Sequence, residues 1–274
     1  MKNKLWLFWI LAIVITLGAA VYQRKTGPTY PSKQTITINN NTYSFELPRS
    51  HNSTSDCNID LKIPDTSISA TVFYKRYPTT DEYSPVAFVR NGERLQTFIP
   101  SQPPAGKLAY YVELKSATGE SVIVGKEEPV LIRYKGEVPA WVLIPHILLI
   151  FLAMLFSNFT GILAIAKHPR FRFWTRLTFW FLLFGGMVMG PFVQHFAFGA
   201  YWTGIPFGYD LTDNKTLIAF VGFIVAMVFN FKKPHRISVI IATVLMLVIF
   251  SIPHSARGSQ LNYQNGQVDT GKQK

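Results

Sequence analysis

Long runs of apolar residues alternate with polar segments along this 274-residue chain. A bilayer core takes about 20 helical residues. Two of the runs are shorter than this and need their flanking residues, or a locally thinner bilayer, to cross. The pattern predicts a membrane α-helical bundle of about five transmembrane helices. These helices are expected at residues 5–22, 141–166, 173–197, 217–231 and 237–252.

The chain between the first two apolar runs has a different pattern. It contains short segments rich in β-branched and aromatic residues, separated by turn signals, as in β-sandwiches. One signal, Asn91-Gly92, suits a type I′ hairpin turn, in which both central residues need positive φ. We therefore expect an inserted all-β, immunoglobulin-like sandwich. Its strands are predicted at residues 35–38, 43–47, 70–74, 86–89, 95–99, 108–114, 121–124 and 130–134.

The first apolar run follows Lys2 and Lys4 and is longer than the apolar core of about 7–15 residues in a signal peptide. An uncleaved signal anchor is favoured over a cleaved signal peptide. The tail after the last run is polar and rich in Gln, Asn and Gly, which predicts disorder. The expected organisation is an anchor (1–25), an extracytoplasmic β-sandwich (26–138), a four-helix transmembrane bundle (139–254) and a disordered tail (255–274).

The formal net charge of +12 lies outside the predicted sandwich, because residues 26–138 contain equal numbers of acidic and basic residues. The excess basic residues flank the apolar runs, as topology signals do. They do not form the clustered basic face that would indicate nucleic-acid binding. The positive-inside rule predicts a multi-pass protein of the cytoplasmic (inner) membrane. Its N-terminus and two basic loops, 167–172 and 232–236, would be cytoplasmic, while the β-sandwich, the loop 198–215 and the tail would lie outside.

One part of the predicted sandwich shows a resemblance. Residues 70–114 contain the strings ATVFYKR and VAFVRNGERLQTFIPSQPPAGKLAYYVEL. They resemble bacterial immunoglobulin-like or fibronectin-type-III-like modules, in which a strand ending in IP, a PAG turn and a YY strand recur, with a tyrosine that ties down a corner. The resemblance implies a module that serves as a binding domain, as a spacer or as a domain that presents a binding site. The membrane half resembles no family of known function.

Three histidines are candidates for a metal or cofactor site. His146, His195 and His254 fall at similar depth near the predicted outer ends of three helices. Three imidazoles at one level could bind zinc or copper, and two could bind a haem. Asp210 and Asp213, in the loop 198–215, could add carboxylate ligands. Alternatively, the histidines occupy the headgroup region, and Asp213 or its neighbour Thr212 caps the following helix.

Small residues predict close helix packing. Gly186 and Gly190 form a G-x-x-x-G pair in the third apolar run, and Gly222 lies in the fourth. Such residues let helices approach within a bundle or at the contact of a homo-oligomer. Pro191 is expected to kink its helix.

The sequence contains no recognised catalytic signature, such as G-x-S-x-G, H-E-x-x-H, a P-loop or C-x-x-C. The single cysteine, Cys57, cannot form an internal disulfide. Enzyme activity is therefore not indicated, although an active site of an unfamiliar type would also lack these signatures. We expect a membrane-embedded binding or scaffold protein whose partner is another membrane or extracytoplasmic protein. The alternative is a metal- or haem-binding membrane protein.

Overall fold

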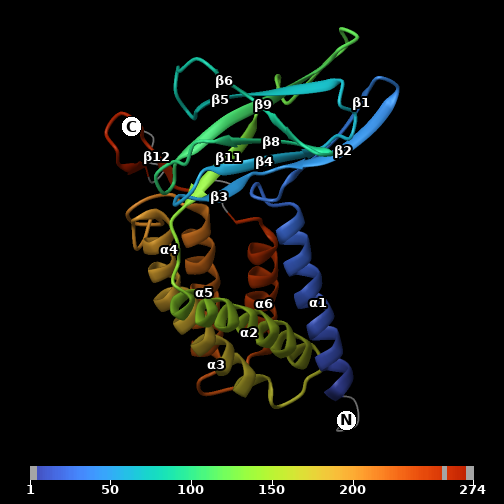
Figure 1. Ribbon diagram of the computed structural model, residues 1–274. Helices are drawn as coiled ribbons and strands as arrows, with labels where there is room; N and C mark the ends of the chain where they lie inside the picture. Colours follow the sequence, from blue (N-terminus) through green and yellow to red (C-terminus); the bar gives the residue numbers. More distant parts are fainter. Residues whose placement is uncertain (1–4, 255–257, 270–274) are drawn as a thin grey trace. The chain divides into compact units, whose positions relative to one another are not determined.

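The chain folds into two compact units in the computed structural model (Figure 1). The helical unit combines the N-terminal apolar segment with the apolar segments that follow the insertion. The β unit includes a short C-terminal segment as well as the expected insertion. The structure describes residues 5–254 and 258–269; within them, the helical unit takes residues 5–28, 138–254 and 258–259, and the β unit takes residues 29–137 and 260–269.

The helical unit contains the apolar runs as helices. They are α1 (Leu5–Lys25), α2 (Ala140–Ile165), α3 (Phe171–Leu182), the π-helical segment η2 (Leu183–Met189), α4 (Gly190–Phe198), α5 (Leu211–Phe229) and α6 (Arg236–Ser251). Because α3, η2 and α4 form one continuous helix of 28 residues, four helices among the described residues are long and apolar enough to span a membrane. The fifth expected span, α6, is apolar but has only 16 residues.

The π-helical segment η2 directly precedes the turn that contains Pro191. A proline has no N–H to donate to the carbonyl four residues earlier, and its ring crowds that carbonyl. A wider π turn, a common form of helix irregularity, accommodates the proline without ending the helix. The irregularity expected at Pro191 is therefore present as a widened helix just before it.

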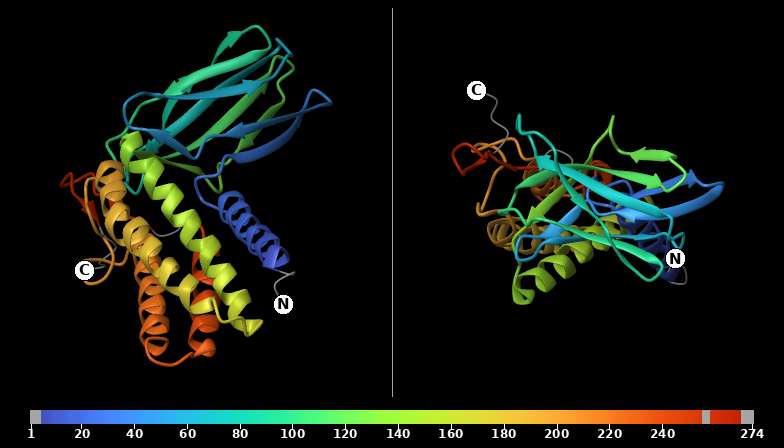
Figure 2. Two further views of the ribbon diagram at one scale, coloured as in Figure 1. Left: turned by 90° about the horizontal axis from the view of Figure 1, so that it is seen from below. Right: turned by 45° about the horizontal axis from the view of Figure 1, so that its top comes forward.

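The helices of the helical unit pack side by side, with α2 against α1, α3 and α6 (Figure 2). Small residues such as Ala12, Ala153 and Ala226 are buried between them, while large apolar residues elsewhere on the same helices face outward. This arrangement is typical of helices in lipid, where small residues allow close approach. Asn158 donates a hydrogen bond of 2.9 Å from Nδ2 to Oγ1 of Thr16, which links α2 to α1.

Glycines set the closest contacts in the helical unit. A Cβ on Gly185 would lie 2.7 Å from Cβ of Leu149, and one on Gly186 would lie 2.7 Å from Cγ2 of Thr216. A Cβ on Gly222 would lie 3.1 Å from a leucine methyl group on α6, whereas one on Gly190 would have its nearest neighbour at 3.9 Å. The tight α2 contact therefore uses Gly185 rather than Gly190.

The described strands of the β unit pair in antiparallel fashion, apart from the parallel pair of β3 and β11. A six-stranded sheet has the order β3-β11-β9-β5-β6, with β10 paired to β9; a three-stranded sheet has the order β4-β8-β7; and β1 pairs with β2. The strands are β1 (Ser32–Ile38), β2 (Asn41–Leu47), β3 (Ser50–Asn52), β4 (Cys57–Lys62), β5 (Ile68–Arg76), β6 (Ser84–Ala87), β7 (Val89–Asn91), β8 (Arg94–Ile99), β9 (Lys107–Ser116), β10 (Ser121–Val124) and β11 (Val130–Lys135).

The six-stranded and three-stranded sheets contribute side chains to one core, including Ile59 of β4, Val72 of β5 and Tyr110 of β9. Every predicted strand segment overlaps an observed strand, but β3 and β4 were not predicted. The predicted strand at 86–89 is two strands in different sheets. The change of sheet occurs at Phe88, whose N–H donates to the carbonyl of Ala70 at 2.9 Å.

Two hairpin turns are set by residues with positive φ. Asn39 and Asn40 have φ of 53° and 60°, as a two-residue type I′ turn between β1 and β2 requires. Between β7 and β8 the turn lies one residue later than expected, because Asn91 pairs with Arg94 across the ladder. Gly92 is then the first loop residue, with φ of 57°.

The C-terminal segment differs from the expectation of a disordered tail. Residues 260–269 form a hairpin of β12 (Gln260–Leu261) and β13 (Val268–Asp269), which belongs to the β unit. Leu261 is buried, and its N–H donates to the carbonyl of Ala105 at 3.0 Å. One apolar anchor and a backbone hydrogen bond therefore hold a segment whose composition is otherwise polar.

Candidate functional site

The candidate histidines of the helical unit make different contacts. His146, in α2, donates from Nδ1 to the carbonyl of Gly185 at 2.9 Å, because a carbonyl oxygen can only accept. The ring of His195, in α4, stacks on that of Tyr201, with centroids 4.1 Å apart and planes 2° apart. His254 follows α6 in a turn, where it lies within electrostatic range of His146, Lys215 and Asp210.

The contacts of His146 and His195 link neighbouring segments of the helical unit. The His146 hydrogen bond joins α2 to the π-helical segment, and the stacked His195 joins α4 to the loop that follows it. Within residues 5–254 and 258–269, no group of three His, Cys, Asp or Glu side chains could hold a metal ion. The described geometry therefore does not assemble the predicted three-histidine metal site.

Both candidate carboxylates are buried and hydrogen-bonded at the start of α5. Asp210 is the N-cap of that helix: Oδ1 accepts from the N–H of Thr212 at 2.8 Å, and Oδ2 accepts from the N–H of Ser259 at 2.8 Å. Oδ2 of Asp213 accepts from the N–H of Thr203 at 2.6 Å and from its hydroxyl at 3.0 Å. The cap is thus Asp210, and neither Thr212 nor Asp213.

A third charged residue completes this arrangement. Lys215 is buried and donates from Nζ to the carbonyl of Ile252, at the end of α6, at 2.6 Å. Gln194 of α4 donates from Nε2 to the hydroxyl of Thr203 at 2.7 Å. We call Gln194, Thr203, Asp210, Asp213 and Lys215 the α5 polar cluster.

The α5 polar cluster joins the end of α4 and the loop before α5 to the chain after α6, which is distant in the sequence. Hydrogen bonds offset the cost of burying charges: Asp210 and Asp213 each accept two, and Lys215 donates one. A glycine is required at position 204 of the loop, because a Cβ on Gly204 would lie 2.8 Å from both Asp213 Cβ and Asn214 Oδ1. The geometry indicates a clamp that fixes the loop.

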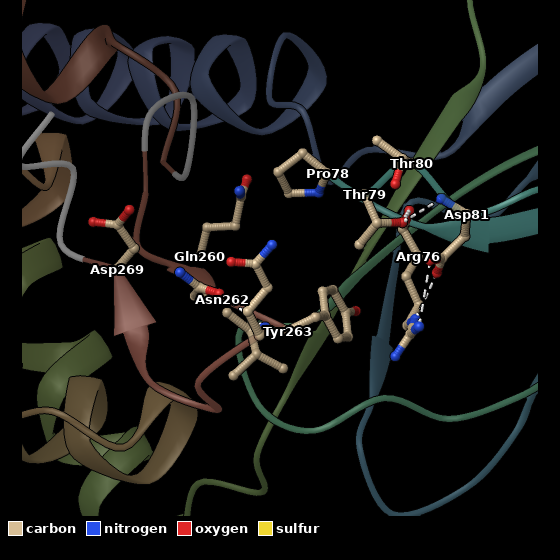
Figure 3. A pocket seen from close by; sticks show the side chains of 11 residues that line it. Arg76, Pro78, Thr79, Thr80, Asp81, Gln260, Asn262, Tyr263 and Asp269 are labelled. Carbon is tan, nitrogen blue, oxygen red and sulfur yellow. Dashed lines mark hydrogen bonds and ion pairs between the residues drawn. The ribbon is translucent and has the colours of Figure 1, made fainter. Parts of the chain in front are cut away.

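A second candidate site is a cleft of 640 Å³ in the β unit. Figure 3 shows hairpin side chains on one side of it and those of the loop between β5 and β6 on the other. Most of the residues that line it carry amide, hydroxyl or charged groups, and they surround one aromatic ring. Its lining includes Arg76, Thr80, Asp81, Asn262, Tyr263 and Gln264.

Tyr263 attaches the hairpin wall to the rest of the β unit. Its Oη accepts from the N–H of Lys107 at 2.9 Å and lies 2.9 Å from the Lys107 carbonyl and 3.1 Å from Oε1 of Gln102. A Cβ on Gly106 would come within 3.0 Å of this hydroxyl, so the glycine permits the contact. Lys107 also donates from Nζ to Oε1 of Gln260 at 2.9 Å.

Charged groups shape the opposite wall. Arg76 donates from Nε to Asp81 at 2.6 Å, and its guanidinium lies 5.4 Å from the ring centroid of Tyr263. The hydrogen bond from Arg76 lowers the pKa of Asp81, so the carboxylate stays ionised at neutral pH. Burial, with the nearby charge of Arg133, lowers the pKa of Lys107 to about 8. The cleft thus offers an arginine, a tyrosine and a carboxylate side by side.

The chain matches no protein-family model and no curated protein sequence. Sequence reasoning missed the cleft because one of its walls was expected to be disordered. The local signal was present, since Leu261 and Tyr263 are large side chains within a polar tail.

Proposed function

We propose that this chain is a multi-pass protein of the cytoplasmic (inner) membrane whose β unit, an immunoglobulin-like domain on the extracytoplasmic side, binds a protein partner. Four helices of sufficient length and apolarity support insertion. The basic loops between α2 and α3 and between α5 and α6 support an orientation with these loops in the cytoplasm.

The C-terminal hairpin supports an even number of membrane crossings by the chain that connects the two parts of the β unit. Residues 29–137 and 260–269 belong to one compact unit, so both must lie on the same side of the membrane. The chain between them contains α2, the continuous α3–α4 helix, α5 and α6. Three crossings would place the hairpin on the wrong side, so α6 must also cross, with its flanking residues or a thinner bilayer making up its length.

The cleft of the β unit is the observation that carries the binding proposal. Arginine and tyrosine are enriched among the residues that dominate the energy of protein interfaces, and Arg76 and Tyr263 lie in contact in this cleft. Asn262 and Gln264, beside them, offer amide donors and acceptors that match a partner's backbone. The histidine arrangement gives no such support to metal or haem binding.

Site-specific photocrosslinking in intact cells tests the proposal. A photoreactive residue at Gln264, in the cleft, should give a discrete crosslinked species, whereas one at the exposed Thr37 of β1 should not. Truncating an interface residue of this type costs 2 kcal/mol or more, so Arg76→Ala should reduce the crosslink about 30-fold.

Arg94 provides the matched control, because it forms a comparable ion pair with Asp60, at 2.7 Å, outside the cleft. Arg94→Ala should leave the crosslink unchanged. Equal yields from Gln264 and Thr37, or equal losses with the two arginine variants, would contradict a partner bound in the cleft.

A further inference from the structure

A groove of 880 Å³ lies on the helical unit, between α3 and the end of α5. Three cationic side chains, Arg176, Lys232 and Lys233, line it together with the aromatic residues Trp180, Phe229 and Phe231. We call it the basic groove. Phe231 is 78% exposed and Trp180 50%, so apolar surface here is not covered by the helical unit.

The polarity of the basic groove changes along its length. Arg172, Arg176 and Trp180 are spaced four residues apart on α3, so they share one face, and each step moves about 6 Å along the axis. Lys232 and Lys233 follow the end of α5. Cations therefore occupy the end of the groove nearest the loops, and Trp180 lies roughly 12 Å beyond Arg172 toward the middle of the bundle.

The walls of the groove are fixed by hydrogen bonds. Arg172 donates to the carbonyl of Asn230 at 2.6 Å and to that of Phe231 at 2.8 Å. The buried Asn230 accepts from the N–H of His235 at 2.7 Å and donates to the carbonyl of Ala226 at 2.8 Å. Because the turn after α5 is held in place, a ligand would meet a preorganised site with little ordering cost.

The charge at this end of the helical unit is not balanced. Every ion pair found among the described residues lies in the β unit. Residues 138–259 contain only two acidic residues, Asp210 and Asp213, and both lie at the other end of α5. The three cations of the basic groove therefore present uncompensated positive charge beside apolar surface.

We propose that the basic groove binds an anionic phospholipid, with the phosphate at Arg176, Lys232 and Lys233 and the acyl chains along Trp180. Basic pockets between transmembrane helices are suited to anionic headgroups, and the exposed ring of Trp180 offers apolar surface to acyl chains. An amphiphile matches the gradient from charge to apolar surface, which a free phosphate would not use. This inference rests on the membrane insertion in the proposed function.

Native mass spectrometry of the full chain tests the inference. The protein is extracted in mild detergent from carbonate-washed membranes and offered equal amounts of phosphatidylglycerol and phosphatidylcholine. We expect one phosphatidylglycerol to be retained in preference to phosphatidylcholine, and excess glycerol 3-phosphate not to displace it. Each basic residue near an anionic lipid strengthens binding about five-fold, so the triple variant R176Q/K232Q/K233Q should bind about 100-fold more weakly.

A second triple variant, K167Q/R170Q/R236Q, removes the same charge from exposed positions at the same helix ends that do not line the groove. It should retain the lipid within about three-fold of the natural chain, because these exposed charges do not line the groove and are screened by salt. Equal retention of the two lipids, displacement by glycerol 3-phosphate, or equal losses in the two triple variants would overturn the inference. Recovery of the chain in the carbonate-soluble fraction would instead refute membrane insertion itself.

Discussion

The attachment of the C-terminal hairpin to the β unit depends on the hydroxyl of Tyr263. In Tyr263→Phe, the ring remains, but the N–H of Lys107 loses its acceptor at 2.9 Å. The carbonyl of Lys107 keeps a donor, because it also accepts from the N–H of Tyr77 at 3.0 Å. One partly buried donor is therefore left without a partner, which costs about 1–3 kcal/mol.

This cost should appear as local opening of the hairpin. Hydrogen exchange monitored by mass spectrometry on peptides that cover residues 258–269 reports the opening free energy of that segment. Exchange in Tyr263→Phe should be faster by about 5- to 150-fold, the factor that corresponds to 1–3 kcal/mol. Tyr77→Phe is the control, because Tyr77 is exposed and no side-chain hydrogen bond is found for it among the described residues. Unchanged exchange in Tyr263→Phe would refute the reasoning.

Three further variants test the packing and the electrostatics. Asp213→Ala leaves the N–H and hydroxyl of Thr203 without their acceptor, so it should destabilise the helical unit by about 2–5 kcal/mol in thermal unfolding in detergent; an unchanged Tm would contradict the clamp. In the same assay Gly185→Ala should cost about 1–3 kcal/mol, whereas Gly190→Ala should cost nothing; equal effects would be inconsistent with the packing. Since burial lowers the pKa of Lys107 from 10.5 to about 8, the unfolded chain binds more protons between these values. Urea unfolding of the β unit, followed by circular dichroism, should therefore show stability rising from pH 8 toward pH 10, by up to about 3 kcal/mol, and a slope that persists in Lys107→Met would exclude this cause.

Strands with local signals were predictable, and those that depend on a partner were not. The segment at β5 and β9 is rich in β-branched and aromatic residues, whereas β4 reads CNIDLK. Its alternation is clear in the structure, with Cys57, Ile59 and Leu61 buried. Each outward position is polar, however, so composition favoured a loop, and only pairing with β8 makes the segment a strand.

The site residues show the same division. The charged residues Asp210, Asp213 and Lys215 were visible as a group in the sequence, but the partners Ile252 and Ser259 come from another segment. Equal depth of the histidines was inferred from counting along helices, which says nothing of the direction in which each ring points. The hydrogen bond from His146 to Gly185 and the stacking of His195 on Tyr201 depend on helix rotation and on the π-helical segment.

Cysteine labelling of sealed, right-side-out membrane vesicles tests the central claim, which is membrane insertion with the β unit and the hairpin outside. The natural chain is a suitable background, because Cys57 is buried and burial raises its pKa to about 12. A membrane-impermeant maleimide should label Gln264→Cys, in the hairpin, before permeabilisation, and should label Lys233→Cys, in the basic loop after α5, only afterwards. Labelling of both positions from the same side, or in the reverse order, would contradict the proposed topology.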